Sequence, residues 1–73
     1  MSHRFTAIIE REDDVYVALC PELDIASQGE TVSDARASLA EAIELFLETA
    51  SEEEKRRRLS GEVYVTQIEV SGA

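Results

Sequence analysis

The segment Cys20–Thr31 constrains the fold most, because the chain changes direction three times within it. Pro21 lacks the amide hydrogen that a strand ladder needs, so the apolar run Val15–Cys20 ends there. A short strand follows, Gly29 ends that strand, and Thr31 is placed to cap a helix. The segment contains no obvious nucleophile, metal-ligand set or phosphate-binding loop. It indicates a rigid scaffold that presents a surface, which favours binding over catalysis.

Four strands are predicted. Arg4–Glu10 and Val15–Cys20 have strand length and are rich in β-branched or aromatic residues. The polar residues Arg11–Asp14 between them predict a hairpin turn. Leu23–Gln28 is a shorter third strand. Glu62–Val70 alternates around several large apolar side chains and predicts a fourth strand.

Two helices are predicted between the third and fourth strands. Apolar residues recur at helical spacing over Val32–Ala50, which predicts a long amphipathic helix. Thr31 is its N-cap, and acidic residues are enriched around its first turn. Ser51–Arg58 begins a second helical piece, because Ser51 with Glu54 matches a capping box. In this piece the acids come first and the bases follow four residues later, which is the favourable order.

This order of elements, β-β-β-α-(α)-β, predicts one α+β domain over residues 1–73. We expect a four-stranded, antiparallel-rich sheet: a meander of three strands, one long helix across one face, and the last strand added to an edge. Phe5 and Ile9 fall on one face of the sheet and Ile8 on the other. The uncovered face would then expose more apolar surface than a monomer comfortably tolerates, which predicts a homo-oligomer.

The net charge and the length of the chain limit the classes of partner and of stabilising site that it can have. The net charge is −9, from 16 acids and seven bases, so phosphate backbones are repelled and a basic protein is a natural partner. One cysteine and one histidine make neither an internal disulfide nor a four-ligand zinc site. Oligomerisation is the remaining source of stability for 73 residues. We expect a cytoplasmic protein, because no signal peptide and no membrane-spanning apolar run is present.

Three groups of residues could carry chemistry, and each has a plainer interpretation. Glu12–Asp14 could hold a metal ion as in a nuclease, but consecutive acids in a turn are usually solvated. Cys20 could be a nucleophile, yet the single histidine, His3, lies at the terminus. Lys55–Arg58 resembles a nucleic-acid patch, but each arginine follows an acid one turn earlier. We therefore predict a protein that is not an enzyme and needs no cofactor.

The stretch Tyr16–Thr31, with Glu41-Ala42-Ile43 further on, resembles the HicB-type antitoxins and their single-domain, UPF0150-like relatives. The shared pattern is a strand ending in Pro-Glu-Leu, a short strand, Ser/Thr-x-Gly-Asp/Glu-Thr, and an alanine-rich helix ending in Glu-Ala-Ile. The resemblance covers Phe5–Glu48, and the last strand fits it in position but not by motif.

The resemblance implies a partial RNase H-like fold without the metal-binding acids of that enzyme. It also implies that the protein neutralises a small, basic, HicA-like toxin that cleaves messenger RNA, by covering the catalytic histidine and the RNA surface of the toxin. Antitoxins of this type usually carry a C-terminal DNA-binding domain. Operator binding is not carried over, because this sequence stops at Ala73 after the last strand.

Two sets of interface residues follow from this interpretation. The toxin would be bound by the acids of the matching segment: Glu22, Asp24, Glu41, Glu44 and Glu48. Self-association would use apolar and aromatic strand residues: Tyr16, Tyr64, Ile68 and Val70. Both sets depend on which sheet face the helix covers. The alternative function is an orphan, self-assembling structural or small-ligand-binding domain with no toxin partner.

Overall fold

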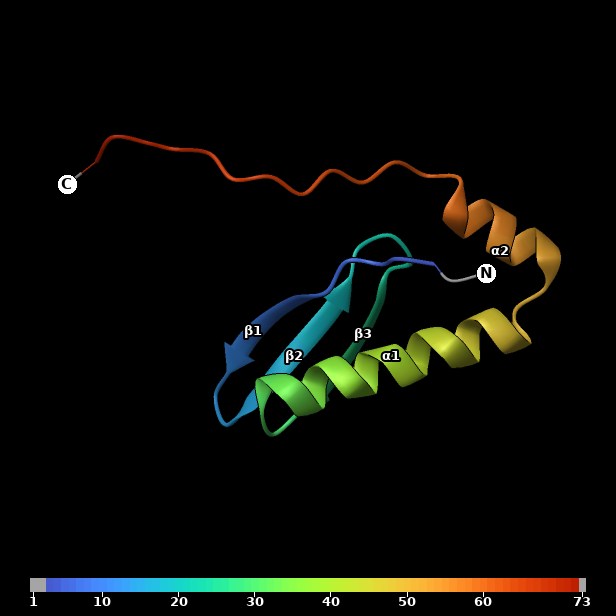
Figure 1. Ribbon diagram of the computed structural model, residues 1–73, viewed down its shortest axis with the longest axis horizontal. Helices are drawn as coiled ribbons and strands as arrows, with labels where there is room; N and C mark the ends of the chain where they lie inside the picture. The colour runs from blue at the N-terminus through green and yellow to red at the C-terminus, as the bar shows by residue number, and fades with distance from the viewer. Residues whose placement is uncertain (1–2, 73) are drawn as a thin grey trace.

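The computed structural model describes residues 3–72 and contains a three-stranded antiparallel sheet with two helices (Figure 1). The strands lie in the order β1-β2-β3 and span, in turn, Ile8–Glu12, Val15–Cys20 and Ile25–Gly29. Helix α1 spans Val32–Thr49, and helix α2 spans Glu52–Leu59. The predicted α+β class is confirmed, and both helices lie within two residues of their predicted bounds.

The β1–β2 hairpin is tighter than the sequence predicts. The two strands pair from Ile8 opposite Leu19 to Glu12 opposite Val15. Asp13 makes the turn with a φ of 54°, in the left-handed region that aspartate tolerates better than most residues. Only two residues remain for the connection, so β1 continues to Glu12 instead of ending at the predicted Glu10. It begins later than predicted, at Ile8, because Thr6 donates its backbone N–H to a side chain instead.

Strand β2 ends at Cys20, as the proline after it predicts, and then pairs with β3 from Tyr16 opposite Gly29 to Cys20 opposite Ile25. Strand β3 begins two residues later than predicted because Leu23 turns into the core, where it is fully buried. The connecting loop reverses at Asp24, whose φ is 55°. The exposed outer edge of the loop therefore carries an acid while its apolar residue anchors the sheet.

Helix α1 covers one face of this sheet, and the core lies between them (Figure 1). The fully or nearly buried residues come from β2, the following loop and α1: Ala18, Cys20, Leu23, Ala35, Leu39 and Ile43. Phe5 and Ile9 pack against this core, whereas Ile8 points away and is 37% exposed, so the predicted division of faces is confirmed. Both helices begin with the predicted side-chain caps, Thr31 and Ser51.

The fourth strand predicted over Glu62–Val70 is not formed. Residues 62–72, which we call the C-terminal arm, run extended without secondary structure and leave the body of the molecule beyond α2 (Figure 1). The radius of gyration is 14.3 Å, against about 11 Å expected for a compact chain of this length. Alternation predicts a segment suited to a strand, but a strand also needs an edge to pair with, and the arm reaches none in the described part of its own chain.

Candidate protein interface

Three acids of α1 form an exposed ridge on the helix. Glu41, Glu44 and Glu48 are all solvent-exposed, and no ion pair among residues 3–72 involves them. Their spacing of three and four residues makes them neighbours, and like charges at this spacing repel by about 0.2–0.5 kcal/mol per pair. We call these three residues the acidic ridge. It gains most from a partner that brings positive charge.

The bases of α2 are arranged differently. Lys55 lies 2.9 Å from Glu52, and Arg58 lies 3.2 Å from Glu54, which also pairs with Arg57. Most of the positive charge of the run Lys55–Arg58, which resembles a nucleic-acid patch, is thus compensated within its own helix. This pairing supports the structural interpretation of the basic run, whereas the three neighbouring acids of the acidic ridge have no such compensation among residues 3–72.

Of the two predicted loop acids, only Asp24 is exposed. Glu22 is half-buried, and its carboxylate accepts a backbone hydrogen bond of 3.0 Å and a hydroxyl hydrogen bond of 2.5 Å from Thr6. These bonds join the N-terminal segment to the β2–β3 loop. Glu22 therefore helps to hold the fold together and is less exposed than predicted, while its part in partner binding stays a prediction.

The same contacts shift two pKa values. Burial opposes ionisation of Glu22, but the hydrogen bonds from Thr6 outweigh it and lower the pKa of the carboxyl group. Burial raises the pKa of the Cys20 thiol, and the neighbouring Glu22 carboxylate raises it further. The thiol also donates to Glu22 over 3.4 Å. Cys20 is fully buried and stays protonated at neutral pH, which is the wrong state for a nucleophile.

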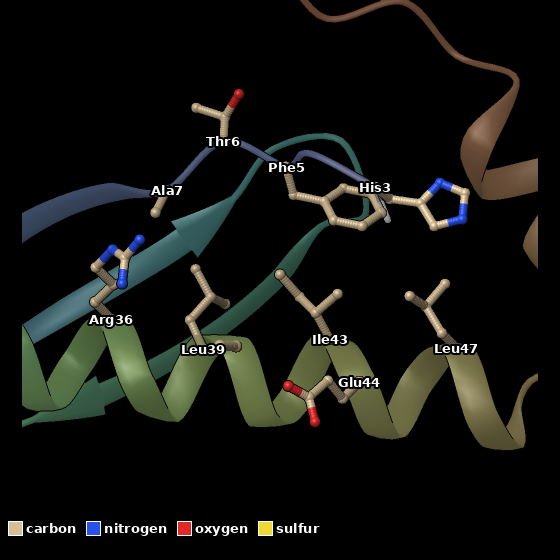
Figure 2. A pocket seen from close by; sticks show the side chains of 10 residues that line it. His3, Phe5, Thr6, Ala7, Arg36, Leu39, Ile43, Glu44 and Leu47 are labelled. Carbon is tan, nitrogen blue, oxygen red and sulfur yellow. The ribbon is translucent and has the colours of Figure 1, made fainter. Parts of the chain in front are cut away.

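An open groove of about 460 Å³ separates the segment before β1 from α1. Figure 2 shows Leu39, Ile43 and Leu47 rising from the helix toward Phe5, with Ala7 further along the strand side. Arg36 and Glu44 add one charge of each sign to the lining. The groove borders β1, which is an edge strand of the sheet. It therefore offers an apolar floor beside backbone groups that have no neighbouring strand.

The predicted self-association residues separate into two places. Tyr16 is half-buried and packs against the core beneath α1, so its side chain is already engaged within the chain. The arm carries the other three, with exposed fractions of 80% for Tyr64, 83% for Ile68 and 74% for Val70. The Tyr64 hydroxyl donates to Glu62 over 2.6 Å, a contact that leaves the ring in solvent. The arm is therefore a second candidate surface, and an apolar one.

Within residues 3–72, no group of three or more His, Cys, Asp or Glu side chains is arranged to hold a metal ion, and the acids at the β1–β2 turn are no exception. None of the helices in the same residues is long and apolar enough to cross a membrane. Thr6, which binds the Glu22 carboxylate, and Arg36, which lines the groove, were not predicted from the sequence. Neither belongs to a local motif, because each acquires its place only through tertiary packing.

Comparison with known proteins gives one informative relative. A UPF0150 protein of Synechocystis sp. is 47% identical over 58 residues, which cover 77% of this chain and 81% of that protein. No protein-family model matches the chain. No solved structure matches it significantly either.

Proposed function

The chain belongs to the UPF0150 family, and we propose that it is a non-enzymatic protein-binding module, related to the HicB-type antitoxins, that neutralises a small basic RNase. The family name itself describes no activity. The proposal combines the sequence resemblance to HicB-type antitoxins with the distribution of charge on the folded chain.

The acidic ridge is the observation that carries the proposal. Glu41, Glu44 and Glu48 lie on the segment that resembles the antitoxins, they are exposed, and they have no ion-pair partner among the described residues. A basic surface laid against them would relieve their mutual repulsion and would associate quickly through complementary potential. Asp24, exposed at the β2–β3 loop, adds a further acid outside the ridge.

The mechanism requires no chemistry from this chain. A toxin that cleaves RNA must present a positively charged surface to the phosphate backbone, because phosphates dominate binding to nucleic acids. Carboxylates on a rigid helix can occupy that surface in place of the phosphates. The partner is then inhibited by occlusion, and its catalytic histidine is covered while the complex lasts.

The resemblance also implies a partial RNase H-like sheet with a fourth strand. Residues 62–70 are the segment that would supply it, since their apolar residues alternate and the backbone runs extended (Figure 1). The open groove beside β1 is the place with room for it. In this arrangement Glu41 and Glu48 of the acidic ridge stay clear of the added strand, because they do not line the groove, whereas Glu44 lies at its border.

A second candidate function is the orphan, self-assembling domain with no toxin partner. The exposed apolar arm favours it, because such a segment is costly to leave in water and calls for a covering surface. Self-assembly and toxin binding use different residues. One protein can therefore both self-assemble and bind a toxin, so the experiment must detect the bound toxin directly.

The test is affinity purification of the tagged full-length chain from its native lysate. We expect a small, strongly basic protein to co-purify, and we expect RNase activity to appear when that protein is separated from this chain. The matched control carries Glu12→Arg, Asp14→Arg and Glu53→Arg, which change the net charge as much as reversal of the acidic ridge does. The control should retain the partner, whereas ridge reversal should release it. Recovery of the chain without any RNase would overturn the proposal.

A further inference from the structure

The C-terminal arm has the composition of a strand and pairs with no strand within residues 3–72. Its large apolar residues Val63, Tyr64, Val65, Ile68 and Val70 are all exposed, from 42% for Val63 upward. An exposed segment of high β-propensity is an aggregation hazard unless another surface covers it. The open edge of β1 and the groove beside it form a surface of the complementary kind.

The lengths of the two segments match. The chain from Arg4 to Arg11 runs along the open edge of the sheet, and the stretch from Glu62 to Glu69 contains the same number of residues. At about 3.3 Å per residue in extended chain, both reach about 26 Å. Residues 62–69 of the arm can therefore cover the edge from Arg4 to Arg11.

Charged residues on the two segments also have opposite signs and equal spacing. The edge carries a base near each end, Arg4 and Arg11, and the arm carries an acid near each end, Glu62 and Glu69. Opposite charges directly across a strand pair contribute roughly 0.2–1 kcal/mol. Strand β3 also has an open edge, but Asp24 and Glu30 flank it and would repel the arm. The charges thus favour the edge at β1.

The apolar residues decide the direction of pairing. An antiparallel arm with Glu69 opposite Arg4 places Ile68 opposite Phe5 and Tyr64 opposite Ile9. Phe5 and Ile9 face α1, so the two arm residues would enter the apolar groove. Glu10 then lies opposite Val63, and Glu12 opposite Gly61, so no two acids meet.

A parallel arm that keeps both charge pairs matches fewer and smaller apolar residues. It places Val63 opposite Phe5 and Val65 opposite Ala7, but it leaves Gln67 opposite Ile9 and Ile68 opposite Glu10. Parallel pairing is also slightly less stable per residue than antiparallel pairing. The apolar pairing and the backbone pairing therefore both favour the antiparallel direction.

The direction of pairing identifies the donor of the arm. Leu59 at the end of α2 and His3 line the same hollow, so the arm of a chain starts at the His3 end of that chain's own edge. From there it can run along β1 only in the parallel direction, as its course in Figure 1 shows. An antiparallel arm must therefore come from another molecule.

We propose that two copies of this chain exchange their C-terminal arms, each arm adding as an antiparallel strand to the β1 edge of the partner and filling the groove beneath it. A two-fold axis relates the copies, so the same surfaces are buried on both and the assembly closes as a dimer. The dimer does not depend on a toxin, and this inference stands apart from the proposed function.

Disulfide trapping tests the exchange directly. Ala7 lies opposite Thr66 in the proposed pairing, and paired antiparallel strands hold such residues within reach of a disulfide. Chains carrying Ala7→Cys and chains carrying Thr66→Cys are purified separately, mixed and oxidised. We expect a covalent dimer that contains one chain of each kind. The matched control replaces Ala7→Cys by Gln28→Cys on β3 and should give no such dimer.

Light scattering on the full chain supplies a second readout. The wild-type mass should be twice the chain mass of 8.1 kDa. Arg4→Glu with Arg11→Glu should halve it, and adding Glu62→Arg with Glu69→Arg should restore it. A wild-type monomer, or an intrachain disulfide in a chain carrying Ala7→Cys with Val65→Cys, would overturn the exchange. The intrachain link would show that each chain covers its own edge.

Discussion

The guanidinium of Arg58 lies 5.5 Å from the centroid of the Phe46 ring, so a residue of α2 is held over the aromatic face of a residue of α1. The same guanidinium donates to the backbone carbonyl of Leu23 in the β2–β3 loop. One side chain thus joins both helices to the loop that anchors the sheet. It fixes the end of α2, from which the C-terminal arm departs.

Replacing Arg58 should therefore loosen α2. We expect Arg58→Ala to lower the free energy of unfolding by about 1–2 kcal/mol, since it removes a cation–π contact and a charged hydrogen bond that are partly exposed. Urea denaturation followed by circular dichroism measures this difference. Arg56→Ala is the matched control, because Arg56 forms no ion pair or hydrogen bond in the described chain. Equal losses from the two variants would contradict the anchoring role.

Gly29 is predicted to be irreplaceable for steric reasons. A Cβ atom there would lie 2.6 Å from the backbone carbon of Asp34 and would also clash with the amide nitrogen of Ala35. Backbone atoms at the start of α1 cannot move aside cheaply, so Gly29→Ala should cost about 1–3 kcal/mol. Gly61→Ala should change stability by less than about 0.5 kcal/mol, because nothing lies within 4 Å of the added atom. Thermal denaturation of both variants checks the contrast.

Glu22 should make stability depend on pH. Its pKa is lowered in the folded state, so its contribution is fully present above the unfolded pKa of about 4.3 and is lost as the pH falls through the folded pKa. We expect Glu22→Gln to cost about 1 kcal/mol at pH 7, because the group is only half-buried. The free energy of unfolding of the Glu22→Gln variant should then fall less between pH 5 and pH 3 than that of the wild type.

Chemical denaturation across this pH range, with Glu48→Gln as control, measures the effect. Glu48 is exposed and has no ion-pair partner in the described residues, so the control should keep the pH dependence of the wild type. If Glu22→Gln kept it as well, the hydrogen bonds from Thr6 would not be the cause.

Reversing a single charge of the acidic ridge should stabilise the isolated chain or leave it unchanged, since three like charges are exposed as neighbours on one helix. Replacing Glu41, Glu44 and Glu48 singly by lysine relieves repulsion by about 0.2–0.5 kcal/mol per pair removed. Thermal denaturation at low salt detects this gain, and 0.5 M salt should diminish it by screening. A loss above about 1 kcal/mol would show that the ridge has a structural partner.

The local signals in the sequence predicted the elements well. Pro21 and Gly29 bound the strands they were expected to end, and Thr31 and Ser51 cap the helices as their motifs predicted. Each of these residues acts on backbone only a few positions away, so its effect can be predicted from the sequence alone. The same holds for the alternation that placed Ile9 and Ile8 on opposite faces.

The long-range contacts were not predictable in the same way. The sequence predicts Glu22 to be an exposed acid beside a proline. Only the folded structure brings Thr6, which lies sixteen residues away in the sequence, into contact with it. The alternation of apolar residues over 62–70 predicts a strand, but it does not show which sheet edge, or which molecule, that strand pairs with. Tyr16 shares its strand-like context with Tyr64, yet one faces the core and the other faces solvent.

The most direct test of the antitoxin proposal is the RNase activity of the protein that co-purifies with this chain, measured before and after the two are separated and recombined. The proposal predicts cleavage of messenger RNA by the separated partner and suppression of that cleavage when the wild-type chain is added back at equimolar concentration. The chain with Glu41, Glu44 and Glu48 reversed to arginine should fail to suppress it. If the separated fraction cleaves no RNA, or if the reversed chain inhibits as well as the wild type, the central claim is contradicted.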